Sequence, residues 1–102
     1  MRIKSGVQLA GVQPEMILAL LIIEPILKDE GQELVITSCT DSLHSHMSRH
    51  YIGYGLDIRS RDIPKDLIEE VARKMSLALG SEYYVKFEVH HYHIQFNGSP
   101  RH

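Results

Sequence analysis

The chain lacks the features that define several specialised classes of protein. Among its 102 residues there is no tryptophan and a single cysteine, Cys39. One thiol excludes an internal disulfide and a zinc cage made of several cysteines. The formal net charge of -2 offers no broad basic surface, so nucleic acid is not an expected partner.

Long hydrophobic runs are also missing. The longest apolar stretch, 16–23, is far shorter than the roughly 20 residues that a membrane-spanning helix needs. Pro14 and Glu15 precede this stretch and Glu24 and Pro25 follow it, a pattern unlike an export signal. We therefore expect no membrane insertion, and the length of the chain predicts one domain over residues 1–102.

Local patterns predict two main helices. The first is expected over 14–29, mostly buried, with Pro14 in its first turn, a kink at Pro25 and a stop at Gly31. The second is expected over 64–79, with Asp62 as its cap, because apolar residues recur there at helical spacing.

Strands are expected over 33–38 and 54–58, and as one long or two short strands over 83–96, where β-forming residues gather. Residues 1–12 form a lead-in segment that is compatible with a short edge strand. Helices and strands do not alternate regularly enough for a parallel sheet. The predicted fold class is α+β, with two helices packed on one face of a small, mainly antiparallel sheet.

Histidine is the residue type that stands out in the composition. The chain has seven histidines, and all but His102 lie between His44 and His93. On a strand, residues two apart face the same side, so His91 and His93 are expected to project together. Two neighbouring imidazoles form half of a metal site, because a catalytic zinc usually takes three protein ligands and keeps one open position.

The segment 48–57 is the best source of further ligands. His50 and Asp57 are separated by an odd number of residues, so both can reach one ion only if the backbone bends between them. Gly53 and Gly55 lie where that bend is needed.

These residues resemble a known family, the zinc D-alanyl-D-alanine carboxypeptidases and L-alanyl-D-glutamate endopeptidases, which includes small phage endolysins and shares its fold with the Hedgehog signalling domain. The family pattern Ser-x-His-x-x-Gly-x-Ala-x-Asp matches Ser48, His50, Gly53 and Asp57, with Gly55 in the alanine position. A later His-x-His matches His91 and His93. The likeness spans about residues 34–96.

The resemblance implies a Hedgehog/DD-peptidase-like zinc peptidase that hydrolyses stem peptides of bacterial peptidoglycan. His50, Asp57 and His93 would bind Zn²⁺, and His91 would stabilise the developing oxyanion or orient the base. Many members carry an acidic residue where this chain has His90, so Glu88 is our first choice for the general base and His90 the second. Cell-wall peptide is the implied substrate.

Two alternatives remain open at this stage. The chain could be a non-catalytic, zinc-containing binding module of the same fold, because the base position departs from the family pattern, or it could be a plain globular protein without a metal. His44 and Asp41 could orient a zinc ligand, and Arg59 and Arg61 could meet a substrate carboxylate. The likeness to short phage forms predicts synthesis in a bacterial cytoplasm and action on the cell wall. The sequence decides neither the bond that is cut nor the oligomeric state.

Overall fold

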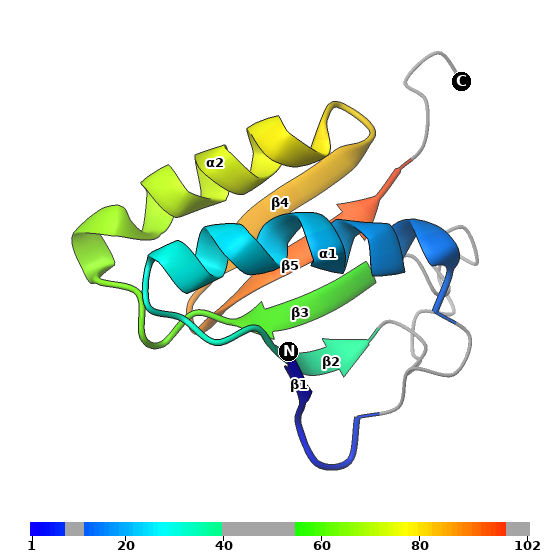
Figure 1. The fold of residues 1–102 in the computed structure, drawn as a ribbon, viewed down its shortest axis with the longest axis horizontal. Helices are drawn as coiled ribbons and strands as arrows, with labels where there is room; N and C mark the ends of the chain where they lie inside the picture. The colour runs from blue at the N-terminus through cyan, green and yellow to red at the C-terminus, as the bar shows by residue number, and fades with distance from the viewer. Residues whose placement is uncertain (8–11, 40–54, 98–102) are drawn as a thin grey trace.

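Two helices cover one face of a five-stranded sheet in the computed structural model of the chain, which describes residues 1–7, 12–39 and 55–97 (Figure 1). The helices are α1 (Pro14–Asp29) and α2 (Ile68–Leu79), the latter preceded by a short 3₁₀ turn, η3 (Lys65–Leu67). The strands are β1 (Arg2–Ile3), β2 (Val35–Cys39), β3 (Gly55–Arg59), β4 (Tyr83–Glu88) and β5 (His91–Phe96).

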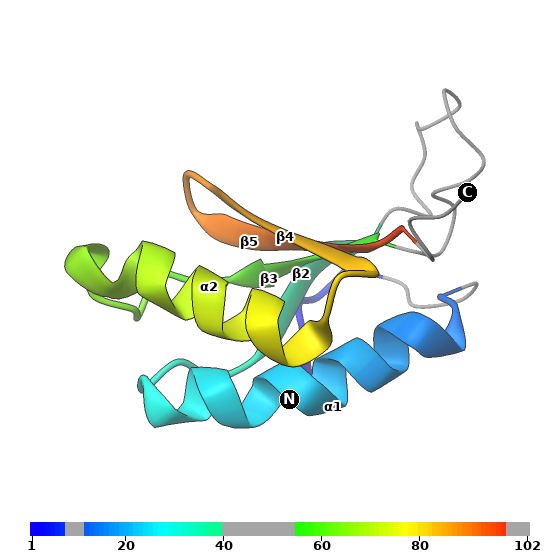
Figure 2. The same ribbon diagram turned by 90° about the horizontal axis from the view of Figure 1, so that it is seen from above.

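The sheet has the strand order β1-β2-β3-β5-β4. Every neighbouring pair is antiparallel except β1 and β2, which run parallel. The view in Figure 2 shows α1 and α2 on the same side of the sheet. The predicted α+β class, with two helices on one face of a mainly antiparallel sheet, is therefore confirmed.

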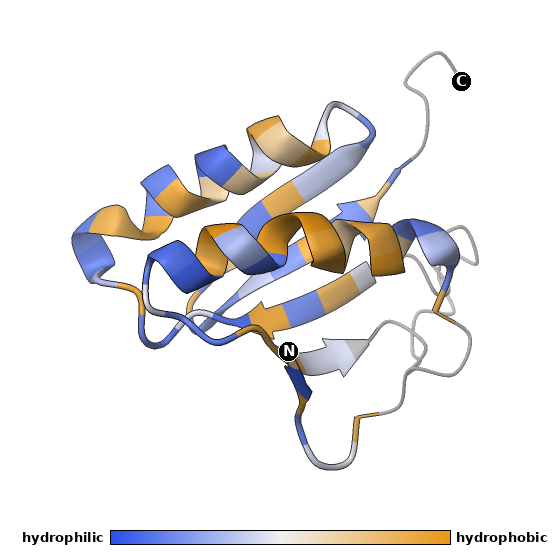
Figure 3. Ribbon diagram, viewed as in Figure 1, coloured by the Kyte–Doolittle hydropathy of each residue, from blue (hydrophilic) through white to orange (hydrophobic). Residues whose placement is uncertain are grey.

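The core lies between the helices and this covered face of the sheet. Alternate residues of β3 and β5 point into it: Leu56, Ile58, Tyr92 and Ile94 are fully buried. They pack with α1 residues such as Leu20 and with the predicted apolar stripe of α2. The hydropathy colouring in Figure 3 shows the same alternation along β3. The neighbouring residues of each strand must therefore face the opposite side, which we call the open face.

Two details of the helices differ from expectation. Ile17 and Leu21 are 43% and 59% exposed, because α1 touches the protein along one side only. Asp62 does not cap α2, which has Leu67 as its N-cap and no side-chain cap bond. Instead the backbone N–H of Asp62 donates to Gln32 Oε1 at 2.9 Å. In the described ranges, no helix combines the length and apolarity required to cross a bilayer.

Candidate metal centre

The candidate site lies on the open face, where the register of the strands brings four predicted residues together. Asp57 of β3 pairs with His93 of β5, and Glu88 of β4 pairs with His91 of β5. Asp57, His91 and His93 therefore project to one side, as the sequence predicts for the two histidines. His50, the third predicted ligand, lies outside the described residues, as do His44, Asp41 and Gly53.

Asp57 is the centre of the cluster. Its Oδ1 lies 2.8 Å from His93 Nδ1, and its Oδ2 accepts a hydrogen bond of 2.8 Å from Ser38 Oγ. The same Oδ2 lies 3.5 Å from His91 Nε2, and His91 Nε2 lies 3.3 Å from Glu88 Oε1. One carboxylate thus connects both histidines of the His-x-His pair to β2.

A bulge in β2 places Ser38 beside Asp57. Ile36 pairs with Ile58, but Ser38 pairs with Asp57, so Thr37 is the extra residue between them. Without this irregularity Thr37 would oppose Asp57, and Ser38 would face the core like Leu56. Thr37 instead donates through Oγ1 to the backbone carbonyl of Asp57 at 3.2 Å. Sequence reasoning missed Ser38, since neither residue type nor local spacing reveals a bulge.

A tight turn sets the position of Glu88 against His91. Only Val89 and His90 connect β4 to β5, and the backbone N–H of His90 donates to the carbonyl of Glu88. Val89 has a φ of +44°, in the left-handed region that β-branched residues rarely adopt. His90, the second-choice base, has an exposed side chain in this turn and no place in the Asp57, Glu88 and His91 group.

The charges of the site are coupled. Burial is the largest influence on the pKa of Asp57 and raises it, but the hydrogen bonds from His93 and Ser38, with His91 nearby, outweigh burial and lower that pKa. The hydrogen bond to Asp57 raises the pKa of His93 against the opposing effect of burial. The contact between Asp57 and His93 thus favours the ionised form of the carboxyl group and the protonated form of the imidazole.

His93 is held between two acceptors, since its Nε2 lies 3.0 Å from Gln95 Oε1 while its Nδ1 faces Asp57. Gln95 in turn donates to Asn97 Oδ1 at 2.7 Å. A histidine that binds a metal through one ring nitrogen usually donates its other N–H to such an acceptor. In this orientation Gln95 fixes Nε2, and Nδ1 would be the ligand atom if His93 bound a metal. Gln95 is a second residue that the sequence did not indicate.

Three of the described residues lie close enough together to hold a metal ion. Asp57, Glu88 and His91 each offer one ligand atom within 4.8 Å of the other two. Two ligands of one tetrahedral zinc ion lie about 3.3 Å apart, given bond lengths of roughly 2.0–2.2 Å. The separations of His91 Nε2 from Glu88 and Asp57, 3.3 and 3.5 Å, fit this value. The 2.8 Å hydrogen bond between Asp57 and His93 would have to lengthen by about 0.5 Å to fit it.

The donor set consists of imidazole nitrogens and carboxylate oxygens, which are ligand types of zinc. Asp57 belongs to both arrangements, the predicted one with His93 and the group with Glu88 and His91. In the second arrangement Glu88 and His91 are ligands, whereas the sequence assigns them catalytic roles. The described residues are compatible with either arrangement, and both depend on Asp57.

Comparison of the chain with protein-family models, with curated proteins and with solved structures finds no match. The resemblance to the zinc peptidases therefore rests on the motif residues of the sequence.

Proposed function

We propose that this protein is a zinc metallopeptidase of Hedgehog/DD-peptidase-like fold that hydrolyses peptide bonds in peptidoglycan stem peptides. The observation that supports this proposal most directly is the convergence of Asp57, His91, His93 and Glu88 on the open face of the sheet. Asp57 and His93, together with His50, are the proposed zinc ligands.

The contacts of the described residues support the roles that we propose for them. Asp57 would supply negative charge to the cation, and the hydrogen bond from Ser38 holds the orientation of its carboxylate. Gln95 keeps the ring of His93 turned with Nδ1 toward Asp57. Bound zinc would supply a water molecule of lowered pKa and would polarise the substrate carbonyl.

Glu88 is the proposed general base, because its carboxylate stands beside His91 at the edge of the cluster and is half-buried. It would accept a proton from water and pass the proton to the leaving amine. His91 Nε2, between Glu88 and Asp57, would donate a hydrogen bond to the oxygen of the substrate carbonyl as negative charge develops there.

One observation favours a second candidate, a non-catalytic zinc-binding module. If zinc binds to Asp57, Glu88 and His91, Glu88 is a ligand and no longer serves as a base. The two candidate functions therefore predict different effects of Glu88→Gln on zinc content and on hydrolysis. A base variant keeps zinc and loses hydrolysis, whereas a ligand variant loses zinc.

The test begins with metal analysis of untagged protein and continues with purified cell walls. We expect a single zinc per chain, newly released amines from the walls, and loss of both in Asp57→Asn. Glu88→Gln should retain zinc and lose hydrolysis, while Glu69→Gln, an exposed carboxylate change on α2, should retain both. Zinc-loaded protein that releases no amines across a pH series would overturn the hydrolase and leave the binding module.

A further inference from the structure

A second group of charged residues on the open face lies beside the candidate metal centre. A hollow of about 330 Å³ opens there, and the described residues of its lining include three cationic side chains and no acidic one: Lys4, Thr37, Arg59, Arg61, His90 and His91. His91 belongs to both the hollow and the metal-binding group. The hollow is therefore next to the atoms that would hold the ion.

The fold brings these cations together from distant parts of the sequence. Arg59 ends β3 and pairs with His91 across the sheet. The backbone N–H of Lys4 donates to the carbonyl of Ile36 at 2.9 Å, which extends the β1 edge to the level of Thr37. Like charges held this close repel one another, and within the described residues none of the three cations has an ion pair or side-chain hydrogen bond in the hollow.

The described carboxylate whose pKa Arg59 affects, Glu33, already has an ion-pair partner. Arg59 contributes to the lowered pKa of Glu33, but the largest cause is the hydrogen bond to that carboxylate from Arg2, which also forms its 3.1 Å ion pair. A neighbouring hollow of about 470 Å³ shares Arg61 and His90 but includes Glu69 in its lining. Among the described lining residues, the larger hollow therefore contains a carboxylate and the smaller one contains none.

We infer that this hollow binds a free carboxylate of the substrate. Guanidinium groups match the planar, two-oxygen geometry of a carboxylate, and Arg59 and Arg61 supply two of them. The inference rests on the proposed peptidase function for the identity of the substrate. His91 lines the hollow and also belongs to the candidate metal centre. The substrate should therefore carry its free carboxylate no more than one residue away from the peptide bond that is cut.

The test measures binding to zinc-free protein, in which no carboxylate can coordinate an ion and no peptide is cut. The probes are N-acetyl-D-alanyl-D-alanine and its C-terminal amide, titrated while the backbone NMR signals of Lys4, Arg59 and Arg61 are followed. We expect the acid to bind about tenfold more tightly than the amide, the effect of a charge-assisted hydrogen-bonded pair.

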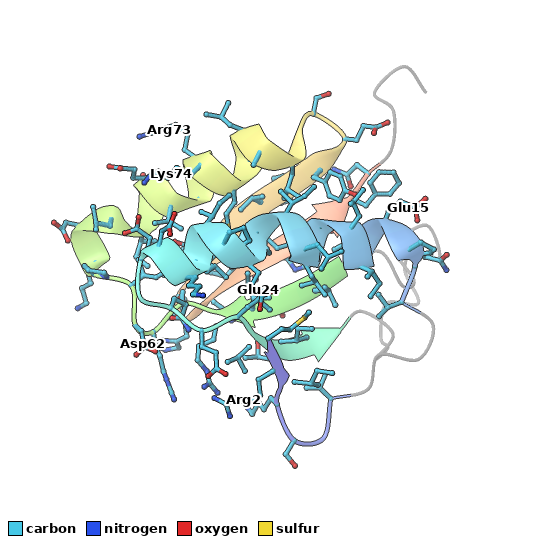
Figure 4. The ribbon with its side chains drawn as sticks, viewed as in Figure 1. Arg2, Glu15, Glu24, Asp62, Arg73 and Lys74 are labelled. Carbon is cyan, nitrogen blue, oxygen red and sulfur yellow. The ribbon has the colours of Figure 1, made fainter. Side chains whose placement is uncertain are left out.

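Arg59→Gln and Arg61→Gln should each reduce this preference to about threefold or less. Arg73→Gln is the matched control, because it removes the same charge from α2. Figure 4 shows Arg73 far from Asp62, which is next to Arg61 in the chain. Lys86→Gln is a second control on the open face, outside the hollow. Both controls should keep the tenfold preference. Arg61 is exposed, so its variant tests the site even if Arg59→Gln does not fold.

Three results would overturn the inference: equal binding of acid and amide, a preference that survives both arginine changes, or an equal loss in Arg73→Gln, which would indicate attraction by net charge. A fourth comes from competition. If inorganic phosphate displaces the acid at lower concentration than acetate does, the hollow is a phosphate site. If the protein prefers the acid but does not hydrolyse cell walls, the carboxylate site is supported and the peptidase function is rejected. If it hydrolyses peptides with and without the carboxylate equally well, the peptidase function is supported and the carboxylate site is rejected.

Discussion

The two faces of the sheet are built from the same strands, but one face forms the core and the other carries the polar cluster. Along β5, Tyr92 and Ile94 are fully buried under the helices, whereas His91 and His93 face the other way and contact Asp57. A single residue step along the strand separates a side chain that stabilises the fold from one that is available for chemistry. Alternation therefore lets a short chain hold both a core and a polar cluster in one sheet.

The two faces also differ in how they tolerate charge. Burial opposes ionisation of Asp57, and the contacts from His93 and Ser38 overcome that opposition. On the covered face, Tyr92 keeps its proton and donates to the carbonyl of Ile68 at 2.6 Å. The open face therefore stabilises charged groups of the kind that bind metal ions, whereas Tyr92 on the covered face is held in its neutral form.

The largest expected effect comes from a cavity on the covered face. Ile94→Ala should lower the free energy of unfolding by about 3 kcal/mol, because it removes buried methyl groups from a packed core. Gln95→Ala, one residue along on the open face, should cost within about 1 kcal/mol. Urea unfolding of the metal-free proteins measures both. Equal losses would show that the open face also carries the stability of the fold.

Much of this comparison follows from the sequence. The helix expected over 14–29 has the bounds of α1, because Pro14 and Gly31 mark its ends locally. The alternation of Leu56 and Ile58 around Asp57, and the shared face of His91 and His93, follow from the period of a strand. These features depend on residues close together in the chain.

Features that depend on the pairing of strands far apart in the chain could not be predicted from the sequence. The bulge at Thr37 is visible only once β2 is aligned with β3, and it alone gives Ser38 its contact with Asp57. Lys4 joins Arg59 only through the parallel pairing of β1 with β2. Asp62 has the residue type of a helix cap, but Gln32 binds its backbone instead. Register and tertiary contact, rather than propensity, decide these positions.

The next prediction sharpens the comparison at the bulge. Ser38→Ala should weaken zinc binding about tenfold, since removal of a group that orients a metal ligand typically costs roughly 10–100-fold. Thr37→Val is the matched control: its hydroxyl reaches only the backbone carbonyl of Asp57, so zinc affinity should change less than about threefold. Competition with a zinc chelator measures both. Equal losses would mean that the bulge, and not the Ser38 hydroxyl, positions Asp57.

A third prediction concerns the proton that the covered face retains. Burial raises the pKa of Tyr92 to about 12, with a smaller contribution from Glu30, while an unfolded tyrosine has a pKa near 10. Because the folded pKa is the higher one, the stabilisation is complete below about pH 10 and is lost as the pH rises toward about 12. Urea unfolding over an alkaline pH series should show this decline.

Tyr92→Phe is the control for that decline. It should cost about 1 kcal/mol at neutral pH through the lost hydrogen bond and should flatten the alkaline part of the profile. Tyr83, whose pKa burial also raises, leaves a residual slope in the variant. An unchanged slope would assign the alkaline loss to groups other than Tyr92.

The smallest effect is expected at the turn that connects β4 to β5. Val89 is 76% exposed and has a φ of +44°, a conformation that costs a residue with a Cβ roughly 1–2 kcal/mol. Asparagine tolerates this region better than valine, so Val89→Asn should stabilise the metal-free protein by about 0.5 kcal/mol, part of that cost. Val89→Ile keeps the branched Cβ and should bring no gain. Because Glu88 and His91 remain opposite one another in the same turn, zinc affinity should stay within about threefold; a larger loss would show that the strained backbone itself positions Glu88 against His91.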